Sequence, residues 1–310
     1  MKIVERDEVL QQLSMEQCMR LMRKVLLDLE EGTAQQPLRT IQALPGGNQF
    51  AFMPACLGGY FGAKVITVFP GNQVSAYPSH QGYVLLFESK HGSLFGMADG
   101  SAITQIRTGA VSGVATDLLA RRDAYRLAII GAGVQGRSHL EAMLLVREIR
   151  EVYVYDISPE NAQRYRQEMQ EKFGVAIQVC ESVEQAVRNA DIICTVTPSV
   201  QPYLQKEWIQ PGTHINAVGT CSPVTREITS ALFAAASVYA DQMEALRKES
   251  GEYLIPLQEG LIEPQHIRGT IGELLRGRIS GRSSREQITL FDALGLAAED
   301  IACARFLLTK

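Results

Sequence analysis

The chain has 310 residues, 46% of them hydrophobic and 21% charged, and a formal net charge of −4 at pH 7. This composition predicts a soluble globular protein and argues against a disordered one. The chain contains no block of lysine or arginine, so we expect no nucleic-acid partner. No apolar run is long enough to cross a bilayer, so we expect no membrane contact. The length predicts two domains.

The first six residues carry charges too early and too evenly for a secretory signal, which predicts a cytoplasmic protein. The six cysteines are scattered and form no CxxC pair. We therefore expect them to be buried free thiols in a reducing compartment. None of the five histidines has metal-ligand spacing with another, so no metal is expected.

In chain order, the first predicted element is an amphipathic helix over residues 15–31. Ser14 and Gln17 are placed to form a capping box, and Gly32 is a C-terminal stop signal. Residues 38–96 then change to short apolar runs broken by Gly, Pro, Asn and His. This pattern predicts antiparallel strands and hairpins, with apolar runs at 51–54, 63–69 and 83–87 and a turn at 90–93. Residues 97–121 are predicted to form a helix.

A GxGxxG sequence at residues 131–136 follows an apolar strand, and a helix is predicted over residues 137–146. The first glycine of such a turn permits the tight bend, the second lets the backbone approach a pyrophosphate, and the third lets the helix pack on the strand. The helix N-terminus offers unpaired N–H groups to the anion. Asp156 ends the next apolar strand, where it is placed to accept hydrogen bonds from a ribose. Together these features predict dinucleotide binding.

Strands and helices continue to alternate after Asp156. The predicted elements are a helix at 159–172, a strand at 177–180, a helix at 183–190, and strands at 191–197, 214–219 and 237–240. Repeated βα units with continuous apolar strands predict a parallel, doubly wound sheet. The candidate cofactor-binding residues are Gly131, Gly133, Val134, Gln135, Gly136, Asp156, Thr195, Thr197 and Val218. For Thr195 and Thr197, an ordinary role as strand threonines is the alternative.

The sequence resembles the ornithine cyclodeaminase/mu-crystallin family almost from end to end. Beyond the GxGxxG turn, the resemblance rests on residues 64–72, 78–81, 98–110, 211–219, 248–251 and 290–300. It implies a homodimer that acts on small amino or imino acids with NAD(H) or NADP(H). The implied fold class is α/β, with a Rossmann domain over 119–291 and a mixed α/β substrate-binding and dimerisation domain over 1–118, completed by 292–310.

The resemblance also assigns site residues. Arg39 and Arg107 match the family's carboxylate-binding arginines, and the planar fork of arginine suits a carboxylate. Lys64 matches its catalytic lysine, and an apolar run is an unusual place for a lysine without a function or a partner. An outward-facing strand lysine is the alternative. Other residues expected to line the substrate pocket are Gln49, Met53, His80 and Cys221. For Cys221, a role as a nucleophile is the alternative.

Two positions separate this chain from parts of the family. Cys221 stands where cyclodeaminases and archaeal alanine dehydrogenases carry an acid/base aspartate, which favours reduction of a C=N bond over ornithine cyclisation. Asp156 favours NAD(H), because its charge would repel the 2′-phosphate of NADP(H). We therefore expect an NAD(P)H-dependent reductase of cyclic ketimine or imino acids, or a reductive aminase of 2-oxo acids. A lyase that converts ornithine to proline and ammonia, and a non-catalytic ligand-binding protein, are the alternatives.

Overall fold

The computed structural model describes residues 1–75 and 77–310 and divides them into two compact units. Unit 1 comprises Met1–Arg107 and Leu296–Lys310, and unit 2 comprises Thr108–Gly295. The first division lies inside helix α3 (Gly100–Leu119), eleven residues before the division at 118 that the sequence predicted. No helix in the described residues is long and apolar enough to cross a membrane.

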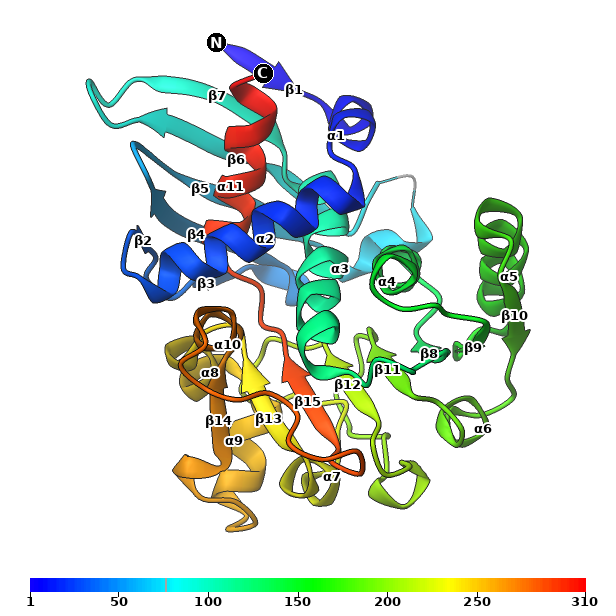
Figure 1. Cartoon of the computed structure of the whole chain (residues 1–310). Helices are drawn as coiled ribbons and strands as arrows, with labels where there is room; N and C mark the ends of the chain where they lie inside the picture. Colours follow the sequence, from blue (N-terminus) through cyan, green and yellow to red (C-terminus); the bar gives the residue numbers. More distant parts are fainter. Residues whose placement is uncertain (76) are drawn as a thin grey trace. The chain divides into compact units, whose positions relative to one another are not determined.

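Unit 1 is built on a sheet of seven strands within the described residues, five of them in hairpin-like antiparallel succession (Figure 1). In spatial order they are β1 (Lys2–Val4), β7 (Leu94–Asp99), β6 (His80–Glu88), β5 (Tyr60–Val68), β4 (Gln49–Leu57) and β2 (Ala34–Gln35), with β3 (Thr40–Ala43) also pairing with β4. β1 runs parallel to β7, and all other pairs are antiparallel.

Helices α2 (Met15–Glu30) and α11 (Ala297–Leu308) form the helical layer of unit 1 (Figure 1). The Ser14 hydroxyl accepts a hydrogen bond from the Gln17 N–H, as the capping pattern predicts. α11 contacts β4, β5, β6 and β7 as well as α2. The last segment of the chain therefore completes the core of the unit that the first segment begins. A shorter helix, α1 (Arg6–Gln12), precedes α2.

The other face of this sheet carries exposed apolar side chains. Phe50, Phe52 and Phe61 are 40%, 43% and 36% exposed, and they alternate along β4 and β5 with buried residues of the α11 side. Phe61 stacks on Phe87 with ring centroids 5.4 Å apart. A sheet with one face in a core normally places polar groups on the other, so this apolar face is unusual.

Unit 2 contains eight parallel strands within the described residues. Their spatial order is β10 (Ala176–Val179), β9 (Glu151–Tyr155), β8 (Arg126–Ile130), β11 (Ile192–Thr195), β12 (His214–Ala217), β15 (Thr289–Asp292), β13 (Ser237–Ala240) and β14 (Ile267–Thr270). The helices between them are α4 (Val134–Val146), α5 (Pro159–Phe173), α6 (Val183–Val187), α7 (Ser230–Ala235), α8 (Met243–Glu249), α9 (Gly251–Gln258) and α10 (Ile271–Arg276). The parallel order and the βα alternation confirm the predicted Rossmann-like α/β class.

Several element boundaries differ from the sequence prediction. Residues 97–99 belong to β7, because they pair with β6, and α3 begins only at Gly100. Asp99 accepts a hydrogen bond from the Ala102 N–H and so closes the first turn of that helix. In unit 2, β11 and β12 end at Thr195 and Ala217, so Thr197 and Val218 lie beyond the strands rather than in them.

The cysteines are all free, but their burial was predicted only in part. Cys18, Cys180, Cys194 and Cys303 are buried, whereas Cys56 and Cys221 are exposed. Cys18 on α2 and Cys303 on α11 place their Sγ atoms 3.7 Å apart where these helices pack. The exposure of Cys56 follows from its place on the outward face of β4.

Candidate active site

Unit 1 buries a lysine beside a carboxylate. Lys64 lies on β5 and is only 2% exposed, and its Nζ lies 2.8 Å from Oδ2 of Asp300 on α11. Nζ also donates a hydrogen bond of 3.3 Å to the Thr104 hydroxyl. Lys64 therefore does not face outward from its strand. It projects to the side of the sheet that α11 covers, where a charge needs a partner.

Arg107 forms a buried cluster of charges with Asp300 and Glu299. Its Nε donates to Asp300 Oδ1 at 3.2 Å, and its Nη1 donates to Glu299 Oε2 at 3.0 Å. Both carboxylates are fully buried, and Arg107 is 5% exposed. Asp300 thus lies between Lys64 and Arg107 and contacts each with a different oxygen. The first turn of α11 favours these two negative charges, because N–H groups point along the helix axis there.

Burial changes the acidity of Lys64. Desolvation lowers its pKa from 10.5 to about 8, and the negative charge of Asp300 opposes this shift. The positive charges of Arg107 and then Arg39 lower the pKa further. With a pKa of about 8, Lys64 carries a proton at pH 7 that it can release near neutrality.

The other predicted substrate residues of unit 1 differ in their burial and in their place on the strands. Met53 is buried and directly opposite Lys64 in the register of β4 and β5. His80 is exposed at the start of β6, and desolvation together with the charge of Lys64 lowers its pKa. Gln49 is exposed at the start of β4, where it pairs with Val68 of β5. Arg39 is half-buried just before β3.

Glu299 and Asp300 were missed as site residues by the sequence reasoning. The segment that contains them was noted only as part of a family resemblance. A signal was present, because two adjacent carboxylates stand at the start of an otherwise apolar segment. Charged side chains are seldom fully buried without paired charges, so such a segment predicts buried cationic partners elsewhere in the chain.

In unit 2, the GxGxxG turn has the shape of a phosphate cradle. Gly131 has a φ of 110°, in the region that favours glycine. A Cβ at Gly136 would lie 2.3 Å from the Gly131 carbonyl oxygen, so helix α4 packs against the turn only with glycine there. A Cβ at Gly133 would meet no atom within 4 Å, which leaves open space at the N-terminus of α4. Val134 and Gln135 open that helix, and Val134 is 53% exposed.

Asp156 follows β9 and contacts the same turn. Its Oδ2 accepts a hydrogen bond of 2.7 Å from the Ala132 N–H, and its Oδ1 accepts one of 2.9 Å from Ser158. The carboxylate is thus fixed beside the glycine-rich turn, and each oxygen keeps a further lone pair for a ligand hydroxyl. These residues fit a dinucleotide with its pyrophosphate at α4 and its adenosine ribose at Asp156.

The remaining predicted residues of unit 2 follow the carboxyl ends of β11 and β12. Thr195 is fully buried and donates its hydroxyl to the Asn216 carbonyl, which favours its role as a strand threonine. Thr197 and Val218 are half-buried, and Cys221 is exposed. Ligands of open parallel sheets bind at this edge of the strands.

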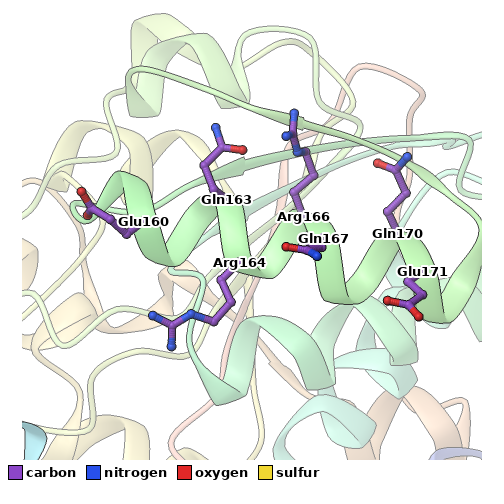
Figure 2. A pocket seen from close by; sticks show the side chains of 7 residues that line it. All are labelled: Glu160, Gln163, Arg164, Arg166, Gln167, Gln170 and Glu171. Atoms are coloured by element: carbon purple, nitrogen blue, oxygen red, sulfur yellow. The ribbon is translucent and has the colours of Figure 1, made fainter.

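A hollow of about 920 Å³ lies elsewhere in unit 2, along helix α5 (Figure 2). It is lined by seven polar side chains of that single helix: Glu160, Gln163, Arg164, Arg166, Gln167, Gln170 and Glu171. None of the residues predicted for catalysis or cofactor binding lies there. A surface formed by one helix face encloses no ligand, so we do not place the active site at this hollow.

Unit 2 carries a glycine-rich turn on a parallel sheet, and unit 1 carries a buried cluster of a lysine and carboxylates. These features define a Rossmann-type α/β protein whose other unit contains a candidate chemical centre. The chain belongs to the ornithine cyclodeaminase/mu-crystallin family, which matches residues 1–310. The resemblance seen in the sequence is therefore confirmed.

Named relatives extend over nearly the whole chain. A Δ1-pyrroline-2-carboxylate reductase of Bacillus cereus is 38% identical over 293 residues, which cover 92% of this chain and 89% of that protein. The structure of Thermococcus litoralis Δ1-pyrroline-2-carboxylate reductase in complex with NADH and L-proline is 36% identical, with a TM-score of 0.97 and coverage of 100% and 97%. An archaeal alanine dehydrogenase dimer with bound NAD is 32% identical, with a TM-score of 0.94 and coverage of 99% and 94%.

Proposed function

We propose that this protein is an NADH-dependent reductase that converts the C=N bond of a small cyclic ketimine carboxylate to an L-amino acid, or reductively aminates a small 2-oxo acid. The observation that carries the proposal is Lys64, buried beside Asp300 with a pKa of about 8. A lysine in this state suits the protonation of an imine nitrogen at neutral pH. The pyrroline-2-carboxylate reductases among the relatives support a cyclic imino acid as the substrate.

Two arginines of unit 1 suit a substrate carboxylate. Arg107 lies beside the Lys64–Asp300 pair, and the positive charge of Arg39 also acts on Lys64. The planar fork of arginine provides paired N–H donors for a carboxylate. In this proposal Arg39 and Arg107 bind the carboxylate, Lys64 donates the proton, and Asp300 keeps Lys64 charged.

The cofactor residues of unit 2 fit the same reaction. Gly133 and the first turn of α4 would hold the pyrophosphate of a nicotinamide dinucleotide, and Asp156 would accept hydrogen bonds from the adenosine ribose. The bound nicotinamide would supply the hydride. The charge of Asp156 favours NADH over NADPH, because it would repel a 2′-phosphate.

Cys221 argues against the cyclodeaminase alternative. Loss of ammonia from ornithine needs a proton shuttle in addition to the hydride exchange, and the family resemblance places Cys221 where cyclodeaminases carry the aspartate for that task. Reduction of a preformed C=N bond needs one hydride and one proton. Lys64 can supply that proton without a further acid.

The test is NADH oxidation by the purified protein with the five- and six-membered cyclic ketimine carboxylates. We expect turnover that falls by at least about a hundredfold in Lys64→Ala, the range typical of a lost general acid. Lys90→Ala, at an exposed lysine in the turn after β6, should retain wild-type turnover. Ammonia release from ornithine without net NADH oxidation would instead establish the lyase. NADH binding with neither reaction, and with no NADH oxidation on small 2-oxo acids plus ammonia, would overturn the reductase and the lyase alike.

We also propose that the protein is a homodimer joined through the apolar face of the unit 1 sheet. Phe50, Phe52 and Phe61 form this face together with half-buried neighbours, and a monomer would leave it in water. A second copy offers the same face, and such self-complementary contacts are the rule in two-fold dimers. The dimeric archaeal alanine dehydrogenase supports this choice of partner.

A further inference from the structure

A buried carboxylate in unit 2 joins the two chain segments that follow β11 and β12. Glu227 is fully buried. Its Oε1 accepts hydrogen bonds from the Thr197 N–H at 2.8 Å and from the Thr197 hydroxyl at 2.6 Å. Its Oε2 accepts a hydrogen bond from the Gly219 N–H at 2.9 Å. The Tyr203 hydroxyl donates a further bond of 2.7 Å to Oε1.

The two joined segments occupy corresponding places on neighbouring strands. β11 ends at Thr195 and β12 at Ala217, so Thr197 and Gly219 each lie two residues beyond a carboxyl end. A Cβ at Gly219 would lie 2.1 Å from the Thr197 carbonyl oxygen and 2.6 Å from the Glu227 carboxyl carbon. The segments are therefore as close as a glycine allows, and Glu227 holds them at that separation.

A second buried glutamate, Glu252, holds the backbone of Glu227 in place. The Glu227 backbone N–H donates to Oε1 of Glu252 on α9 at 2.6 Å, and the Ile228 N–H donates to Oε2 of Glu252 at 3.1 Å. Glu252 is 2% exposed. Backbone N–H groups can only donate, so each of these contacts requires an oxygen acceptor. Glu252 therefore fixes the backbone at Glu227, and the Glu227 side chain in turn fixes the two segments at Thr197 and Gly219.

We propose that Glu227 is a positioning residue that sets the surface on which the nicotinamide half of the cofactor lies. This inference rests on the proposed NADH-dependent function. The carboxyl edge of β11 and β12 is where a parallel sheet of this class binds its ligand, while the adenosine half is assigned to Asp156 and the glycine-rich turn on β8 and β9. A change at Glu227 should therefore weaken contacts to the nicotinamide and leave those to the adenosine half unchanged.

The experiment compares two ligands on the full chain, NADH and ADP-ribose, by calorimetry. Glu227→Gln keeps the size of the side chain but turns an NH₂ donor toward one of the N–H groups. We expect the ratio of the NADH to the ADP-ribose dissociation constant to rise about tenfold, as for the loss of a charge-assisted hydrogen bond. A smaller folded fraction lowers the measured stoichiometry for both ligands alike and leaves this ratio unchanged.

Gly219→Ala provides a second variant, because the new Cβ forces the segments apart without removing the carboxylate, and it should raise the same ratio. The control is Glu207→Gln, at an exposed glutamate in the short 3₁₀ helix Lys206–Trp208, which should leave both constants unchanged. A ratio that rises by less than about threefold in both test variants overturns the inference. If the wild type binds NADH but reduces no ketimine, the proposed function fails while the binding comparison still decides the role of Glu227.

Discussion

Asp300 lies between Lys64 and Arg107, with one carboxylate oxygen 2.8 Å from the lysine Nζ and the other 3.2 Å from the arginine Nε. One buried carboxylate therefore pairs with a lysine and an arginine at the same time. Its charge raises the pKa of Lys64 against the larger effect of burial. A residue of the last helix thus moderates the acidity of Lys64.

Replacement of Asp300 should shift the pH dependence of the reaction. In Asp300→Asn the charge that raises the Lys64 pKa is lost, so this pKa falls below its value of about 8. The basic limb of the kcat/KM profile, measured from pH 6 to 10, should move to lower pH by about one unit or more. Glu299→Gln is the matched control, because it neutralises the neighbouring carboxylate, which pairs with Arg107. An unchanged limb in Asp300→Asn would exclude Lys64 as the titrating acid.

Arg107 should matter for the geometry of its guanidinium and not only for its charge. Arg107→Lys keeps the charge but removes the fork that a carboxylate binds, so KM for the ketimine carboxylate should rise about tenfold or more. Steady-state kinetics with the same substrates measure this. Arg20→Lys, on the exposed side of α2, is the control and should have wild-type KM. Wild-type KM in Arg107→Lys would mean that Arg107 serves only the charge balance of Glu299 and Asp300.

Asp156 should control the choice between cofactors. Asp156→Asn keeps an oxygen for one of the two backbone N–H groups that the carboxylate holds, while the negative charge is removed. Because that charge repels a 2′-phosphate, the preference for NADH over NADPH in kcat/KM should fall about tenfold. The measurement is the ratio of the two kcat/KM values in each protein. A preference that does not change would locate cofactor selection at another residue.

Asp292 should make the stability of the protein depend on pH. It is 1% exposed, and burial raises its pKa from 3.8 to about 7. Between these values the folded state binds a proton that the unfolded state has lost, so the free energy of unfolding falls as pH rises from about 4 to about 7. Asp292→Asn removes this pH-dependent loss of stability, while an oxygen remains to accept the hydrogen bond from the Ser250 hydroxyl. Above pH 7 the variant should be more stable than the wild type, by about 2–4 kcal/mol.

Urea unfolding at pH 5 and pH 8 measures the Asp292 effect. The difference between variant and wild type should be larger at pH 8, because the wild-type carboxyl is then ionised in its buried place. Glu171→Gln, at an exposed position on α5, should show no such difference. A variant that is equally destabilised at both pH values would show that Asp292 acts through packing alone.

The proposed dimer should dissociate when its apolar face is charged. Phe52 is 43% exposed on β4, and Phe52→Asp would bury an unpaired carboxylate in a dimer interface. Light scattering after gel filtration should therefore find a dimer for the wild type and a monomer for the variant. Leu145→Asp changes a residue that is 51% exposed on α4, and it should remain dimeric. A monomeric wild type would contradict the proposal directly.

Local features of the sequence determined much of unit 2. The GxGxxG turn, the apolar strands and the caps act over a few residues, so spacing predicted the parallel sheet and the place of Asp156 at the end of β9. In unit 1, Ser14 and the helical spacing after it predicted α2 almost to the residue. The boundary at residues 97–99 was predicted wrongly, because pairing with β6 outweighs local helix preference there.

The tertiary structure alone decided which charges share a site. Lys64 was identifiable as a catalytic candidate, but its partner Asp300 lies on α11, which reaches the sheet only because the chain returns to unit 1. In the same way Glu227 meets Thr197 and Gly219 because neighbouring strands in the sheet place their ends together. Sequence periodicity predicts which face of each helix or strand is buried, one element at a time. Pairings between distant elements depend on strand register and helix packing, and these arise only when the whole core is formed.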